Sequence, residues 1–140
     1  MEKLLIVDDE EIELDGMAEL IDWPSYGYEL VGTAINGKRG LALIQEKQPD
    51  IVITDIKMPV MDGLELARWV CGAQRQIQII LLTAFADFSY AQQGIRLGVF
   101  DYLTKPFSAE AFGSLLQRVA VRLAQSGRFG GEDTSSESQC

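Results

Sequence analysis

The sequence predicts an α/β fold built on a parallel sheet, and three observations lead to this expectation. Five strand candidates, most of them short and continuously apolar, alternate with five stretches of helical periodicity. The apolar runs lack the polar alternation of a strand with one solvated face, as expected for strands buried on both faces. Strand and helix candidates follow one another as repeated βα units.

Four of the strand candidates end at residues that can carry chemistry. Residues 4–7 lead into Asp8 and Asp9, 51–54 into Asp55, 79–82 into Thr83 and 101–104 into Lys105, whereas 29–34 leads into an Asn-Gly turn. Ligands of open α/β sheets bind at the carboxyl ends of the strands. One edge of the sheet is therefore expected to collect three carboxylates, one hydroxyl and one ammonium group.

The helix candidates carry apolar residues three and four positions apart, the spacing of one helix face. The first ends at Trp23-Pro24, because the residue before a proline is disfavoured in helical geometry, and the second ends near Pro49. Asp62 and Asp87 are expected to cap the third and fourth helices. The predicted inner faces are Leu14, Met17, Ala18 and Ile21; Leu41 and Ile44; Leu66, Trp69, Val70 and Ala73; Ala91, Gly94, Ile95 and Gly98; and Phe112, Leu115, Leu116, Val119, Ala120 and Leu123.

Length and composition indicate one globular domain over residues 1–125, followed by a disordered tail or linker remnant over 126–140, where glycine, serine and glutamate dominate. The formal net charge of −9 argues against direct binding to nucleic acid or to an anionic membrane. No apolar stretch approaches the roughly 18 to 20 residues of a membrane span, and no signal peptide is recognised. A cytoplasmic location is therefore expected.

The chain contains no histidine. This excludes catalytic triads that use histidine as the base, and it excludes metal sites with histidine ligands. Chemistry at the predicted edge must therefore depend on carboxylates, Thr83 and Lys105.

A single aspartate after a strand is commonly a turn former or a helix cap, and Asp8-Asp9-Glu10-Glu11 also suits a helix N-terminus. The combination is more informative. Neighbouring parallel strands lie about 4.8 Å apart, so Asp55 approaches Asp8 and Asp9 if the first and third strands are adjacent. Two carboxylates at about 4 Å repel by roughly 4 kcal/mol at an effective dielectric constant of 20. Such a cluster requires a cation, protonation or a function.

A divalent cation fits this cluster best. Ligands that are all oxygen indicate a hard ion, and a site with few carboxylates suits Mg²⁺, with Mn²⁺ as the near alternative. Asp55 can then act as a nucleophile on phosphorus and form an aspartyl phosphate. Lys105 is placed to neutralise charge on the transferred group.

In this order and spacing the residues resemble the receiver domain of two-component response regulators. The resemblance covers residues 2–125 and rests on Leu-Ile-Val-Asp8-Asp9-Glu10, on Pro-Asp-Ile-Val-Ile-Thr-Asp55-Ile-Lys-Met-Pro59 with Met61-Asp62-Gly63, on Leu-Thr83-Ala84, and on Asp101-Tyr102-Leu-Thr-Lys105-Pro106-Phe107. It implies a flavodoxin-like (CheY-like) doubly wound sheet of five parallel strands in the order 2-1-3-4-5, with five helices. It also implies a cis peptide bond between Lys105 and Pro106.

The resemblance implies a role for each residue of the predicted edge. Asp55 would be the phosphoacceptor, and Asp8, Asp9, Asp55 and the backbone carbonyl of Lys57 would hold Mg²⁺. Thr83 and Lys105 would contact the phosphoryl group. Thr83 and Tyr102 would form the switch, with Tyr102 rotating into space that Thr83 vacates, although Tyr102 as a packing residue alone stays an alternative.

The stretches 21–32 and 88–91 are similar to receivers of the YesN type, which are usually joined to an AraC-like DNA-binding domain. The resemblance therefore implies a phosphorylation-activated switch in a two-component phosphorelay, with a histidine kinase as partner and transcription regulation as output. No DNA-binding pattern is present in these 140 residues. Homodimerisation upon phosphorylation, through the fourth and fifth helices, is a further expectation from the family.

Two other functions stay open at this point. One is a receiver-like interaction module that works without phosphorylation, and it would show no Mg²⁺-dependent mass gain from acetyl phosphate. The other is a phosphohydrolase that turns over through an aspartyl phosphate. Enzymes of that kind place a second aspartate two residues after the nucleophile, whereas Asp55 is followed by Ile56-Lys57.

Overall fold

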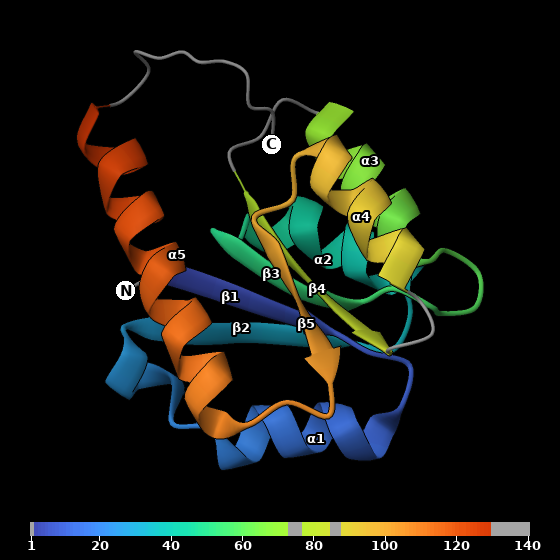
Figure 1. The fold of residues 1–140 in the computed structure, drawn as a ribbon, viewed down its shortest axis with the longest axis horizontal. Helices are drawn as coiled ribbons and strands as arrows, with labels where there is room; N and C mark the ends of the chain where they lie inside the picture. Colours follow the sequence, from blue (N-terminus) through green and yellow to red (C-terminus); the bar gives the residue numbers. More distant parts are fainter. Residues whose placement is uncertain (1, 73–76, 85–87, 130–140) are drawn as a thin grey trace.

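Five parallel strands form the middle layer of the structure, a computed structural model that describes residues 2–72, 77–84 and 88–129 (Figure 1). The strand order is β2-β1-β3-β4-β5, which confirms the predicted doubly wound sheet. All four neighbouring pairs are parallel. The strands are β1 (Glu2–Val7), β2 (Tyr28–Ala34), β3 (Ile51–Asp55), β4 (Gln78–Ala84) and β5 (Asp101–Lys105).

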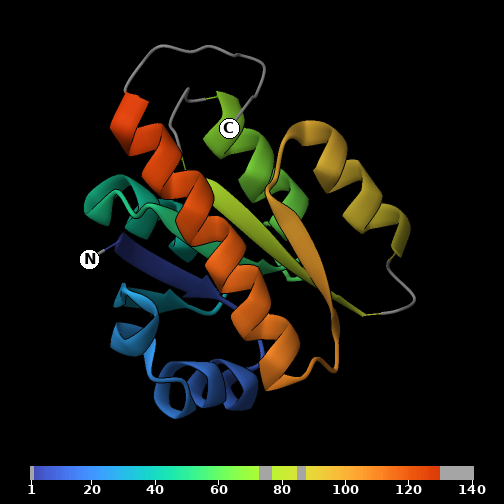
Figure 2. The same cartoon turned by 60° about the vertical axis from the view of Figure 1, so that its left-hand side comes forward.

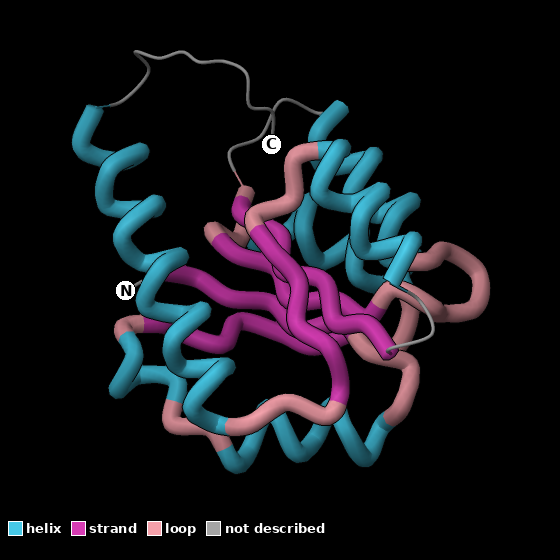
Figure 3. The backbone as a smooth tube through the Cα atoms, in the orientation of Figure 1, coloured by secondary structure: helices cyan, strands magenta, loops and turns pink. Residues whose placement is uncertain are grey.

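Helices cover both faces of this sheet (Figures 2 and 3). One face carries α1, a short 3-10 helix η1 and α5, and the other face carries α2, α3 and α4. The helices are α1 (Glu11–Leu20), η1 (Trp23–Tyr26), α2 (Gly37–Lys47), α3 (Gly63–Gly72), α4 (Phe88–Leu97) and α5 (Ala109–Phe129). Within the described ranges, no helix has the length and apolar character needed to cross a lipid bilayer.

Alternation along β1, an inner strand of the sheet, divides the core into two halves. Leu4 and Ile6 of β1 pack with α1 and α5, whereas Leu5 and Val7 pack with α2 and α3. All four side chains are buried, because β1 has a strand on each side and helices above and below. This explains why the strand reads as a continuous apolar run.

The first helix ends at Leu20, earlier than the predicted end at Trp23-Pro24, and a second short helix follows it. Residues 23–26 form η1, with Pro24 near its start, where the missing amide hydrogen is not needed. Trp23 is buried, donates a hydrogen bond of 3.1 Å from Nε1 to the carbonyl of Met17, and packs edge-on against Phe112. Long-range packing of one tryptophan therefore orders a segment that has no periodic pattern.

Two predicted inner faces need correction. On α3, Leu66 and Val70 are buried but Trp69 is half exposed. On α4, Ala91 and Gly94 are buried, whereas Ile95 is 43% exposed. Gly98 follows the helix with φ of 110°, so it ends α4 and is not part of its inner face. Helical spacing locates a stripe, but the packing partner decides how wide the buried stripe is.

The last helix continues past the expected domain boundary at residue 125. α5 runs to Phe129, so residues 126–129 of the expected tail are helical. The other tail residues, 130–140, lie outside the described part of the chain, as do Ala73 and the expected cap Asp87. The Lys105–Pro106 peptide bond is cis, as the resemblance implied.

Candidate metal centre at the carboxyl edge of the sheet

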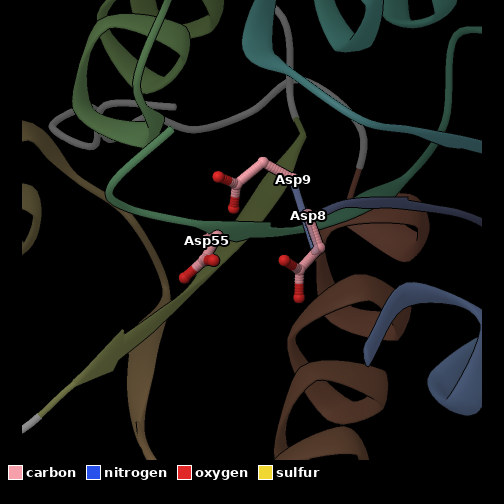
Figure 4. Close-up of side chains that lie close together, drawn as sticks. All are labelled: Asp8, Asp9 and Asp55. Atoms are coloured by element: carbon pink, nitrogen blue, oxygen red, sulfur yellow. The ribbon is translucent and has the colours of Figure 1, made fainter. Parts of the chain in front are cut away.

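The three aspartates predicted to meet do lie together at the ends of β1 and β3. Val7 pairs with Thr54 across these neighbouring strands, so Asp8 and Asp55 stand next to each other one position further on. One carboxylate oxygen each from Asp8, Asp9 and Asp55 lies within 4.8 Å of the other two (Figure 4). The strand order produces this cluster, because it makes β1 and β3 neighbours.

Asp8 is the most buried member of the cluster. Its side chain has no solvent exposure, and its Oδ1 accepts a hydrogen bond of 2.9 Å from the backbone N–H of Glu10. Its Oδ2 has no hydrogen-bond partner. Burial raises the pKa of Asp8 to about 7, more than the nearby hydrogen bond and ammonium group lower it. A buried carboxylate oxygen without a donor is suited to a cation.

Asp55 closes β3 and is 9% exposed. Burial raises the pKa of its carboxyl group, and the ammonium of Lys105 partly offsets this effect. The side chain therefore remains reachable from solvent at one point while most of its surroundings are protein. This is the environment in which a carboxylate can react with a small anion that brings its own counter-ion.

Lys105 supplies the positive charge at the site. Its Nζ lies 3.2 Å from Asp55 Oδ2 and 3.7 Å from Asp8 Oδ2. Burial would lower the pKa of this ammonium group, but the hydrogen bond to Glu13 and the charges of Asp55 and Asp8 raise it above its ordinary value. Lys105 therefore stays protonated at neutral pH and offsets part of the repulsion between the aspartates.

Glu13 belongs to the site, although the sequence reasoning did not select it. Its Oε1 accepts a hydrogen bond of 2.6 Å from Lys105 Nζ, the shortest contact that this lysine makes. Burial acts to raise the pKa of Glu13, but the hydrogen bond from Lys105 and the charge of its ammonium group help to lower it overall. The available signal was an acid in the first turn of the helix that follows Asp8-Asp9, where helix-terminal acids are common.

Thr83 and Tyr102 lie on the neighbouring strands β4 and β5. Thr83 is buried, and its hydroxyl donates a hydrogen bond of 3.0 Å to the carbonyl of Ala84. Tyr102 is half-buried and packs edge-on against Phe88 at the start of α4, with ring centroids 6.1 Å apart. Tyr102 thus joins β5 to α4 in this conformation.

The loop between β3 and α3 holds Lys57 near the site. The Lys57 side chain extends to α4, where Nζ lies 4.8 Å from the centre of the Tyr90 ring, a cation–π contact. The loop is anchored at its end by a hydrogen bond of 2.7 Å from the N–H of Gly63 to the carbonyl of Ile56. Asp62 opens α3 as predicted, since its Oδ1 accepts from the N–H of Glu65 at 2.9 Å.

The donor set fits a hard divalent cation. All the converging ligand atoms are carboxylate oxygens, and one of them, Asp8 Oδ2, is buried without a hydrogen-bond donor. A cation there would neutralise charge that Lys105 only partly offsets. Because the Lys105 ammonium lies beside both Asp55 and Asp8, an anion bound at Asp55 next to the cation would meet the positive charge of both groups.

Comparison with known proteins identifies a family for this arrangement. The family model described as the response regulator receiver domain matches residues 4–117. The transcriptional regulatory protein YesN of Bacillus subtilis (strain 168), itself described as uncharacterized, is 46% identical over 123 residues, which are 88% of this chain and 33% of YesN. The transcriptional regulatory protein HptR of Staphylococcus aureus (strain NCTC 8325 / PS 47) is 36% identical over 132 residues, 91% of this chain and 52% of HptR.

Solved structures agree with the sequence relatives. The REC domain of AraT, a response regulator from Geobacillus stearothermophilus, superposes with a TM-score of 0.84 at 36% identity, covering 90% of this chain and 98% of that domain. A response regulator receiver domain protein from Clostridium thermocellum superposes with a TM-score of 0.80 at 29% identity. The match covers 89% of this chain and 98% of that protein chain. The chain thus spans about one third to one half of the length of YesN and HptR, but nearly all of the isolated receiver domains. The chain belongs to the response regulator receiver domain family.

Proposed function

We propose that this chain is a phosphorylation-activated signalling switch of a two-component system, with Asp55 as the phosphoacceptor. The observation that carries the proposal is the convergence of Asp8, Asp9 and Asp55 beside the ammonium of Lys105. A structural role alone does not require three acids at one point, since their repulsion costs free energy. Membership of the receiver family supports the same role.

The metal ligands proposed are Asp8, Asp9, Asp55 and the backbone carbonyl of Lys57, and Mg²⁺ is the proposed ion, with Mn²⁺ as a substitute. When bound, Mg²⁺ neutralises the carboxylates and the oxygens of the transferred group. The site provides few protein carboxylates, as suits an ion that keeps waters and phosphate oxygens in its coordination shell.

In the proposed reaction, an Asp55 carboxylate oxygen attacks the phosphorus of the donor. A new O–P bond forms while the bond from phosphorus to the donor breaks, and the donor leaves with that electron pair; from acetyl phosphate, the leaving group is acetate. Lys105 stays protonated and donates a hydrogen bond to an oxygen of the transferred group, and the Thr83 hydroxyl donates another. Neither residue needs to lose a proton.

The free energy available from these contacts suffices for a switch. Two charge-assisted hydrogen bonds contribute about 3 to 6 kcal/mol together, and reversing a two-state population from 1:99 to 99:1 requires about 5.5 kcal/mol. Rotation of Tyr102 would move the signal to α4, which Tyr102 already contacts through Phe88. The proposed role is regulatory, with at most self-phosphorylation and self-dephosphorylation as activity.

The partners proposed are a histidine kinase as donor and, in a longer chain, an AraC-like DNA-binding domain as output. YesN and HptR are transcriptional regulatory proteins, and both are longer than this chain. Direct nucleic-acid binding by this segment is not proposed, because its net charge is −9. Homodimerisation on phosphorylation and a cytoplasmic location stay predictions.

Intact-mass measurement after incubation with acetyl phosphate and Mg²⁺ tests the proposal. The wild-type protein should gain one phosphoryl group, and Asp55→Asn should gain none. Asp62→Asn is the matched control. It removes the charge of an aspartate that caps α3, and asparagine can form the same capping hydrogen bond. No Mg²⁺-dependent adduct on the wild-type protein would favour a phosphorylation-independent module, and sustained release of phosphate from many equivalents of donor would favour a phosphohydrolase.

A further inference from the structure

Glu13 makes a contact that the proposed phosphoryl transfer does not use. It lies in the first turn of α1, 92 residues from Lys105 in the sequence, yet it is the nearest partner of the Lys105 ammonium. Glu13 Oε1 and Asp55 Oδ2 lie 2.6 Å and 3.2 Å from the same nitrogen, so these two oxygens are at most 5.8 Å apart. Glu13 is therefore a fourth acid at the site.

This contact competes with the role proposed for Lys105. An ammonium group has three N–H donors, and Lys105 directs one to Glu13 and one to Asp55 while Asp8 lies 3.7 Å away. A phosphoryl oxygen that needs a hydrogen bond from Lys105 must draw the ammonium toward itself. The short hydrogen bond to Glu13 competes with such an oxygen for the same ammonium group.

The surroundings of Glu13 favour a role at the mouth of the site. Its side chain is 40% exposed, compared with 12% for Asp55 and 0% for Asp8. Glu13 and Lys105 also line a mostly apolar cavity of about 290 Å³ between α1 and the segment after β5, together with Met17, Pro106 and Phe107. The cavity leaves room for Glu13 to move when Lys105 turns toward a phosphoryl group.

We propose that Glu13 is a positioning residue that restrains phosphoryl uptake, because it engages the Lys105 ammonium in a short hydrogen bond and adds negative charge near Asp55. The inference rests on the proposed function of Asp55. It assigns to this chain a brake on its own phosphorylation, and the brake acts through Lys105. Neutralising Glu13 removes the charge from this hydrogen bond and so makes the ammonium more available to the transferred group.

The first experiment measures the rate of phosphorylation by intact mass, with acetyl phosphate at fixed concentration and Mg²⁺ at saturation for each variant. Glu13→Gln should react roughly threefold faster than the wild type, within the range of about 1.5-fold to fivefold that partly exposed ion pairs support. Glu11→Gln is the control, because it removes the same charge from the same helix turn without touching a partner of Lys105. Its rate should equal that of the wild type.

A double-mutant cycle separates the contact from the general effect of charge. In a Lys105→Ala background, Glu13→Gln should no longer accelerate the reaction. Equal acceleration in both backgrounds, or equal acceleration by Glu11→Gln, would show a bulk charge effect and overturn the proposal. An unchanged rate in Glu13→Gln would overturn it as well.

A second readout does not depend on phosphorylation. Release of Lys105 in Glu13→Gln should raise the rate at which acetic anhydride acetylates this amine, measured by peptide mass spectrometry with the exposed Lys38 as the internal reference. An unchanged ratio of Lys105 to Lys38 acetylation would show that Glu13 does not restrain Lys105, and would overturn the proposal. Wild-type protein that takes up no phosphoryl group, with a raised ratio in the variant, would instead contradict the proposed function and leave the ion-pair contact intact.

Discussion

The Lys105 ammonium lies 3.2 Å from a carboxylate oxygen of Asp55, although β4 separates the strands that carry the two residues. The lysine side chain therefore crosses the end of β4, where Thr83 is located. One cation reaches acids from β1 and β3, together with Glu13 of α1. Removing any one of these charges should therefore change the electrostatic free energy of the others.

Asp8→Asn should stabilise the metal-free protein and weaken metal binding. The substitution keeps the shape of the side chain but removes a buried carboxyl group, whose pKa is raised to about 7 because burial disfavours its charged form. We expect a gain of about 2 kcal/mol in the free energy of unfolding at pH 8 with chelator, or roughly 8 °C in melting temperature. Thermal unfolding with and without Mg²⁺ measures this. Mg²⁺ at ten times its dissociation constant should add about 1.4 kcal/mol to the wild type and much less to the variant.

Without metal, the protein should lose stability as the pH rises through about 7. The folded pKa of Asp8 lies above its unfolded value, so between the two the folded state holds more protons and stability falls with increasing pH. Burial also raises the pKa of Asp55, so this group changes the stability in the same direction. Glu13, whose pKa is lowered, loses its contribution only as the pH falls below its ordinary value.

Chemical denaturation at about pH 5.5 and pH 8 isolates this effect. The wild type should be more stable at the lower pH, and Asp8→Asn should show a smaller difference. Mg²⁺ should reverse the trend in the wild type, because proton and metal compete for Asp8. A metal-free wild type that becomes more stable toward pH 8 would contradict the burial of a charged Asp8.

Thr83→Ala should leave phosphoryl uptake at Asp55 nearly intact and abolish the response of α4 and β5. The substitution removes the hydroxyl that now donates to Ala84, and with it the proposed contact to the phosphoryl group. Mass spectrometry measures uptake, and amide NMR shifts in α4 and β5 measure the response. Thr83→Ser retains the hydroxyl and should retain the response. Loss of uptake in Thr83→Ala would contradict the division between binding and switching.

Gly63→Ala should displace the phosphoacceptor. A Cβ at Gly63 would overlap the carbonyl oxygen of Asp55 and crowd the backbone of Ile56. We expect the free energy of unfolding to fall by about 2 kcal/mol or more. We also expect weaker Mg²⁺ binding, measured by calorimetry. Gly72→Ala in the same helix is the control, since nothing lies within 4 Å of the Cβ it would add. That variant should bind Mg²⁺ normally, and equal weakening in both would contradict the steric explanation.

Much of the site follows from local features of the sequence. Apolar runs identified the strands. Asp8 and Asp9 directly follow β1, Thr83 lies within β4 next to its last residue, and Asp55 and Lys105 close β3 and β5. The capping of α3 by Asp62 was also readable, because a cap depends on residues within one turn. These features depend on neighbours in the chain.

Other features depend on packing and were missed or misread. Gly94 was predicted on the inner face of its helix and lies there, but no sequence pattern explained why a glycine is needed. In the structure a Cβ at this position would overlap the Leu81 side chain, so the glycine permits the close approach of α4 to β4. Trp69 has the spacing of a buried residue yet is half exposed, because α3 buries a narrower stripe. Glu13 had the appearance of an ordinary helix-terminal acid.

By itself, the sequence determined the alternation of strands and helices and the chemical groups at the strand ends, since both depend on periodicity and on adjacent residues. The family resemblance implied that β1 lies beside β3, and the structure confirmed it. Only the tertiary structure showed that Lys105 reaches across β4 and that Glu13 of α1 takes the shortest contact with Lys105. The physical reason is that these contacts join residues far apart in the chain. They form only when the helices pack on the two faces of the sheet.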